Sequence, residues 1–195
     1  MIPARSSFFL ASLLAICLFA AFCPAEADQA SFFGALDPVF PTGQLRLGAY
    51  AHDPMSPEKG SADINAELLL AKLNLFPGQV WDVLIPRAQL GGTFNFSGKT
   101  SFVYAGAAWT FDVYKNFFVE GSLGEALNNG DVGRNVPSDR NPVGCNWSFH
   151  ETGSLGYRLN ADWSVLATIE HYSNAGLCVR NRGVTNYGLR IGHSF

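Results

Sequence analysis

The sequence has few charged residues and no long apolar run outside its N-terminus. Charged side chains make up 15% of the 195 residues, and the formal net charge is −3. This balance does not favour nucleic acid as a partner, because proteins bind its phosphates mainly through lysine and arginine. Beyond residue 27, no stretch of 18 apolar residues is free of charge, so we expect no transmembrane helix. Histidines and carboxylates do not cluster at metal-ligand spacing, so we expect no metal and no cofactor.

The first 27 residues have the composition of a signal peptide. Arg5 precedes an apolar run over residues 8–22, and alanines at positions 25 and 27 stand at the spacing that signal peptidase recognises. The run is shorter than the about 20 apolar residues that a membrane-spanning helix needs. We therefore expect a cleaved signal peptide, residues 1–27, and one exported domain, residues 28–195.

Apolar and polar residues alternate in several segments of the exported domain. Over residues 163–173 one face reads Trp, Val, Ala, Ile, His, Ser and the other reads Ser, Leu, Thr, Glu, Tyr, and the last ten residues alternate in the same way. Segments of about ten alternating residues are typical of strands with one apolar and one polar face. We expect eight strands, at about residues 43–52, 62–73, 86–97, 100–112, 116–126, 145–159, 162–173 and 185–195.

These strands predict an all-β fold, an eight-stranded antiparallel transmembrane β-barrel of a Gram-negative outer membrane. Phe195 closes an alternating strand at the C-terminus, which is common in such barrels. A periplasmic lipid-binding barrel with an apolar interior is the soluble alternative, and the charged polar faces argue against it. Eight strands enclose a bore that side chains can just fill, so we expect paired charges inside rather than a pore.

The exported domain contains two cysteines, Cys145 and Cys178. Export to an oxidising compartment permits a disulfide. In the predicted strand order, one cysteine enters the sixth strand and the other follows the seventh, both at the outer ends of neighbouring strands. The sequence therefore predicts that they pair and tie the loop after Ser173 to the barrel rim.

Two polar residues interrupt the apolar face of the seventh predicted strand. His171 and Ser173 lie on the same face, with backbones about 7 Å apart. A histidine ring can reach a serine hydroxyl over this distance, which is the geometry of a base and a nucleophile. The alternative is that both residues merely lie at the level of the lipid headgroups. A His-x-Ser pair alone is a weak motif and does not decide between the two.

The residues around this pair resemble the PagL-type lipid A 3-O-deacylases. The resemblance is strong over Glu-His-Tyr-Ser-Asn-Ala-Gly-Leu at 170–177 and on through Asn181 and Gly183 to the C-terminus, and a looser likeness includes residues 63–67, 90–92 and 120–124. These enzymes are outer-membrane barrels that hydrolyse the ester of the acyl chain at the 3-position of lipid A. The resemblance therefore implies a serine esterase that acts on lipid A of lipopolysaccharide in the outer leaflet.

The resemblance also implies roles for individual residues. Ser173 corresponds to the nucleophile and His171 to the general base, while Asn174 and Gly176 correspond to oxyanion donors. The third member of the family's triad is a Glu, and this sequence has Thr185 at that position. Either another acid serves, a dyad works slowly, or activity is lost. The alternative function is a non-catalytic barrel of the same family with a structural or surface-interaction role. No feature predicts the oligomeric state.

Glu151 is a second candidate for the acid, because it is a lone carboxylate on the apolar face of the sixth predicted strand. If the turn at 160–162 pairs Leu159 with Trp163, counting back along both strands sets Glu151 opposite His171, with Cβ atoms about 5 Å apart. A carboxylate there would orient the imidazole and stabilise its charged form. The alternative is a glutamate at the headgroup level that binds water or a cation.

Overall fold

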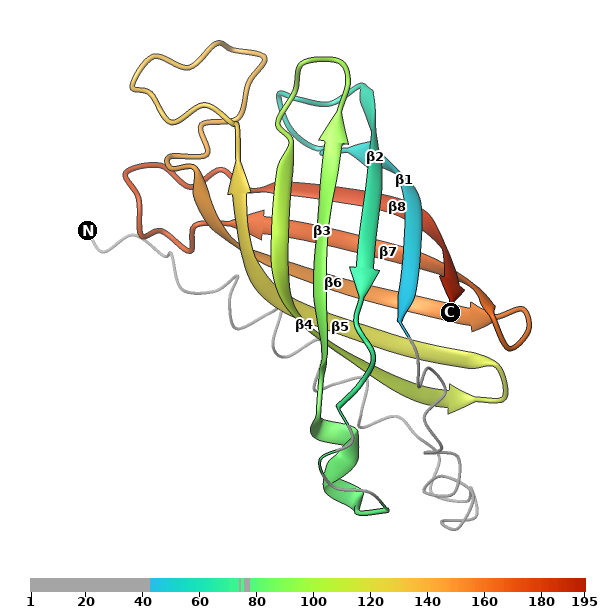
Figure 1. Cartoon of the computed structure of the whole chain (residues 1–195). Helices are drawn as coiled ribbons and strands as arrows, with labels where there is room; N and C mark the ends of the chain where they lie inside the picture. Colours follow the sequence, from blue (N-terminus) through green and yellow to red (C-terminus); the bar gives the residue numbers. More distant parts are fainter. Residues whose placement is uncertain (1–42, 74, 76–77) are drawn as a thin grey trace. The chain divides into compact units, whose positions relative to one another are not determined.

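The computed structural model describes residues 43–73, 75 and 78–195, so the expected signal peptide, 1–27, and residues 28–42 lie outside the described residues. Eight antiparallel strands follow one another around a closed barrel, and β1 pairs with β8 to close it (Figure 1). This confirms the predicted fold class. The strands are β1 (Gln44–His52), β2 (Ser61–Leu69), β3 (Arg87–Asn95), β4 (Phe102–Tyr114), β5 (Phe117–Asn128), β6 (Trp147–Arg158), β7 (Trp163–Ser173) and β8 (Val184–Ser194).

The barrel turns its apolar side chains outward and its polar side chains inward. On β7 the outward residues Trp163, Val165 and Ile169 are exposed, whereas Ser164 and Glu170 are buried in the interior. A barrel in water would have the opposite arrangement, because exposed apolar surface is unfavourable there. The exterior is therefore suited to lipid, as the alternation in the sequence predicted.

One predicted strand is too long. The sequence pattern placed a strand over residues 62–73, but β2 ends at Leu69 and the chain then leaves the barrel for the short 3-10 helix η1 (Val80–Leu84) before β3. The Leu70 N–H still donates to the Ala88 carbonyl of β3 at 2.9 Å, and the apolar residues that continue the pattern beyond it lie outside the strand. No helix in the described part of the chain is long and apolar enough to cross a membrane.

The interior holds a compact group of ion pairs. The Arg46 guanidinium bonds both carboxylate oxygens of Glu120 and one oxygen of Glu67 at 3.1 Å, and Nη1 of Arg190 forms an ion pair with the same Glu67 oxygen at 3.0 Å. All four side chains are buried. Each buried charge thus has an opposite charge beside it, which offsets part of its desolvation cost. The predicted internal charge network is confirmed.

Four loops meet at one end of the barrel, and a buried carboxylate joins three of them. The loops are residues 53–60, 96–101, 129–146 and 174–183. Glu58 accepts hydrogen bonds from the backbone and hydroxyl of Thr100 (both 2.9 Å) and from the Asn141 backbone (3.0 Å), and bonds His52 Nε2 at 2.9 Å. Burial alone would raise the pKa of Glu58, but these bonds outweigh it and lower the pKa to about 2. The loop end is therefore tied together where β1 ends.

Candidate active site

His171 lies on the outer face of β7, two residues before the strand ends. Its neighbours in the sheet are Glu151 on β6 and Thr185 on β8. The predicted register that sets Glu151 opposite His171 is therefore confirmed. Nδ1 of His171 is 2.8 Å from Oγ1 of Thr185. The threonine hydroxyl thus orients the ring through Nδ1, which leaves Nε2 as the nitrogen available to a nucleophile.

Ser173 is the last residue of β7 and shares the outer face with His171; both are half-buried. Gly183, the last residue before β8, lies beside both side chains. A Cβ placed on Gly183 would be 2.8 Å from Cε1 of His171 and 3.0 Å from Cβ of Ser173. The two side chains therefore approach the same point, and the lack of a side chain at Gly183 leaves the room for them.

Glu151 is half-buried and flanks the ring from the β6 side. Among the described residues, the hydrogen-bond partner of Nδ1 of His171 is Thr185 and not Glu151. The carboxylate is therefore a near neighbour of the ring and does not hold Nδ1, where a triad acid usually acts.

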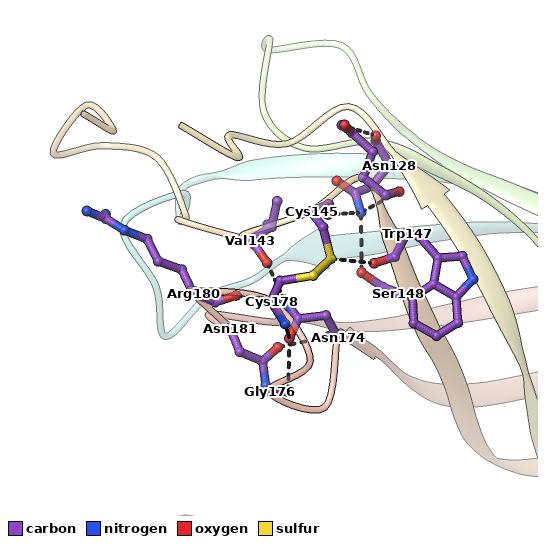
Figure 2. The surroundings of a disulfide bond; sticks show 11 residues. Asn128, Val143, Cys145, Trp147, Ser148, Asn174, Gly176, Cys178, Arg180 and Asn181 are labelled. Carbon is purple, nitrogen blue, oxygen red and sulfur yellow. Dashed lines mark hydrogen bonds between the residues drawn. A yellow bond between two sulfur atoms is a disulfide. The ribbon is translucent and has the colours of Figure 1, made fainter. Parts of the chain in front are cut away.

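Asn174 follows Ser173 directly and anchors the loop behind it (Figure 2). Its buried side-chain amide donates to the carbonyl oxygens of Val143 (2.7 Å) and Arg180 (2.6 Å). Its backbone N–H donates to Oδ1 of Asn181 (2.8 Å), and its own Oδ1 accepts the Gly176 N–H (2.9 Å). The donors of Asn174 and Gly176, which the resemblance assigned to the oxyanion, are thus engaged with protein atoms of this loop and of the loop 129–146.

A tight turn redirects the chain after Ser173. The Leu177 N–H donates to the Asn174 carbonyl at 3.0 Å, and the two central residues, Ala175 and Gly176, have φ angles of 54° and 81°. Two successive left-handed residues define a type I′ turn, in which glycine avoids the steric cost that a side chain brings. The turn keeps residues 174–177 close to the end of β7 and to the serine.

Asn181 is a residue whose role the sequence did not indicate beyond its place in the motif. Its Oδ1 accepts the Asn174 N–H, which fixes the orientation of the amide. Within the described chain, the NH₂ group of this amide donates to no protein atom, and the side chain is exposed. Asn181 therefore offers a side-chain donor that the loop itself does not use. The sequence alone could not show this role, because Asn-x-Gly is also common in turns. The contact between Asn181 Oδ1 and the Asn174 N–H shows it.

Cys145 and Cys178 form a disulfide, with Cα atoms 6.1 Å apart (Figure 2). The bond joins the loop 129–146 to the loop 174–183. Val143, two residues before Cys145, also accepts the Asn174 bond. A covalent and a hydrogen-bonded link therefore hold the turn after Ser173 against the neighbouring loop.

The residues of this site lie within a segment that matches a known protein family. Residues 89–194 match the family described as lipid A 3-O-deacylase (PagL). The crystal structure of the outer membrane enzyme PagL has a similar fold, with a TM-score of 0.62 and 18% identity over 78% of this chain and 99% of that chain. The crystal structure of Neisserial surface protein A (NspA) has a TM-score of 0.49 and 12% identity, and the match covers 78% of this chain and 96% of that chain. No curated protein sequence matches the chain.

The disulfide gives a direct prediction. The exported protein should show no free thiol when titrated under denaturing, non-reducing conditions. A Cys145→Ser/Cys178→Ser double variant should keep the barrel but lose roughly 3 kcal/mol of stability, because the cross-link restricts the unfolded chain. Proteolysis should cut the loop 174–183 faster in this variant than in the wild type. Two titratable thiols in the exported wild type would contradict the pairing.

Proposed function

The chain belongs to the lipid A 3-O-deacylase (PagL) family, and we propose that it is a serine esterase that removes the 3-O-linked acyl chain from lipid A. Its fold and family indicate the outer membrane as its place of action. The observation that carries the proposal is the His171–Ser173 pair on the outer face of β7, with Nδ1 of the histidine held by Thr185 at 2.8 Å.

The reaction uses the pair as base and nucleophile. Nε2 of His171 takes the proton of Ser173 as Oγ attacks the ester carbonyl, which gives a tetrahedral oxyanion. The intermediate collapses as the ester C–O bond breaks, and His171 returns the proton to the departing sugar oxygen. Water, activated by the same histidine, then hydrolyses the acyl-serine and releases the fatty acid.

The position of the pair suits a substrate that is itself a membrane lipid. His171 and Ser173 lie on the outside of the barrel, beside the exposed apolar side chains of Leu123, Leu127 and Ile169 on β5 and β7. Acyl chains can lie along this apolar surface while the sugar remains at the loop end. Lipid A of the outer leaflet therefore meets the serine without leaving the membrane.

Oxyanion stabilisation is assigned to the loop 174–183. The Asn181 NH₂ group is the side-chain donor, and the Gly176 N–H is the backbone donor once it exchanges its bond with Asn174 for one with the substrate. Asn174 itself serves by holding the turn. The Asn181 donor is held in place before the reaction and so costs little reorganisation when the negative charge develops, whereas the Gly176 N–H must first leave Oδ1 of Asn174.

The charge on His171 needs a negative partner, because Thr185 is neutral. Glu151, opposite His171 in the sheet, is assigned to stabilise the imidazolium from the β6 side. The threonine is also the observation that favours the second function, a barrel of this family that has lost catalysis. The activity of purified protein on lipid A separates the two.

Removing either reacting group should abolish deacylation. Ser173→Ala and His171→Asn should each reduce the release of 3-O-linked fatty acid from lipid A in detergent micelles to background, because no nucleophile or base remains. Both variants should keep the heat-dependent gel migration of a closed barrel. His193→Asn is the matched control, since this histidine is on β8 and packs against Trp163. Wild-type activity in Ser173→Ala would exclude the mechanism.

Changing Asn181 to Asp tests the oxyanion assignment. Asp keeps the oxygen that accepts the Asn174 N–H but has no donor, so kcat should fall by about 10²- to 10³-fold. Asn135→Asp, which adds the same charge to the neighbouring loop 129–146, should change kcat little. If the two variants have equal kcat values, the amide of Asn181 does not contact the oxyanion.

Glu151→Gln should lower kcat by about 100-fold or more with the fold unchanged, because it removes a charge that stabilises the imidazolium. Thr185→Glu should recover part of that loss in the double variant, since a carboxylate then contacts Nδ1 directly. Steady-state rates on purified lipid A measure both effects. A Glu151→Gln enzyme as fast as the wild type would remove Glu151 from the mechanism.

A further inference from the structure

A second carboxylate lies behind the threonine that holds His171. The backbone N–H of Thr185 donates to Oδ1 of Asp53 at 3.1 Å. Asp53 follows β1 directly, and only 5% of it is exposed. The sheet register pairs Ala51 with Tyr187, and two more steps set Asp53 opposite Thr185. Asp53, Thr185 and His171 therefore form a continuous hydrogen-bonded series from β1 through β8 to β7.

We propose that Asp53 is a second carboxylate of the esterase site, a positioning residue that acts on His171 through Thr185. The inference rests on the proposed esterase function and adds a residue to it. Asp53 does not touch the substrate; it fixes the backbone of Thr185 and brings a negative charge to the Nδ1 side of the ring.

The contacts of Asp53 fix its carboxylate in one orientation. Oδ1 accepts the Thr185 N–H, Oδ2 accepts the Asn141 amide at 2.6 Å, and the Asp53 N–H donates to Oδ1 of Asn186 at 3.1 Å. No lysine or arginine of the described chain forms a salt bridge with it. Its charge is therefore not neutralised by an ion pair, and a buried charge of this kind acts strongly on groups nearby.

The Asp53 carboxylate provides the negative charge that the Thr185 hydroxyl lacks. When His171 takes the Ser173 proton, its Nδ1–H donates to the Thr185 hydroxyl, which accepts the bond but carries no negative charge. Asp53 lies on the β1 side of Thr185, whereas Glu151 flanks the ring from β6. The two carboxylates thus act from opposite sides, and substitution of each alone separates their contributions.

Asp53→Asn removes the charge with little change of structure. Asp53 has a φ of 35°, a left-handed conformation that Asn tolerates as well as Asp does. The Asn oxygen can still accept the Thr185 N–H. Its new NH₂ group faces Asn141, whose own Oδ1 has no partner in the structure, so a flip of that amide restores the hydrogen bond. Asp139→Asn is the matched control, because Asp139 is exposed and pairs with Lys99.

Two readouts test the proposal. The first is kcat and KM on lipid A. The second is the rate at which a fluorophosphonate labels Ser173, a step in which the Oγ–P bond forms, the P–F bond breaks, His171 takes the proton and fluoride leaves. Asp53→Asn should lower kcat and the labelling rate roughly 10- to 100-fold, less than the about 10⁴-fold caused by loss of a directly bonded acid. KM should change less than about twofold, and Asp139→Asn should match the wild type.

The Thr185→Glu background shows whether Asp53 acts through position 185. There a carboxylate contacts His171 directly, so Asp53→Asn should cost less than about threefold, and the two changes should be non-additive. An equal cost in both backgrounds, or no cost in the wild type, overturns the proposal. If the wild type is labelled at Ser173 but leaves lipid A intact, lipid A is not the substrate. The labelling rates of Asp53→Asn relative to its parent in the two backgrounds then decide for or against the role of Asp53. No labelling of the wild type overturns both.

Discussion

The pairing of β1 with β8 is the interaction on which both the barrel and the site depend. It closes the sheet, so that the backbone of every strand is bonded on both sides, as a lipid surrounding requires. It also brings residues near the two ends of the described chain together. Thr185 on β8 lies between His171 on one side and Asp53 on the other. Without this closure the ring would have a neutral hydroxyl beside it and no acid from β1.

The closed barrel separates a charged interior from an apolar exterior. Inside, Arg46, Arg190, Glu67 and Glu120 are paired and buried. Outside, β7 is apolar from Trp163 to Ile169 and is polar near the loop end, where His171 and Ser173 lie. The loops at the end of the barrel near His171 are joined by Glu58 and by the disulfide. His171 and Ser173, which we propose as base and nucleophile, therefore lie beside loops that are linked to one another.

Much of the fold could be predicted from the sequence, because alternation with a period of two fixes which face of a strand meets lipid. The β6–β7 register came from the turn at 160–162, taken to pair Leu159 with Trp163, and it placed Glu151 opposite His171. Alternation failed where apolar residues continue past Leu69. It is weak in β4, because Phe102 and Tyr104 turn inward and pack on Tyr172 and His150. Asp53 could not be found, since it is 132 residues from Thr185 and only barrel closure brings them together.

Mass spectrometry of lipid A from Gram-negative cells that express the protein tests the esterase function most directly. Cells with the wild type should contain a lipid A species that is lighter by one 3-O-linked acyl chain. Cells with Ser173→Ala at the same level in the outer membrane should contain no such species. An unchanged profile with abundant wild-type protein would contradict the esterase function and favour a non-catalytic barrel. The same mass loss with Ser173→Ala would contradict the assigned nucleophile.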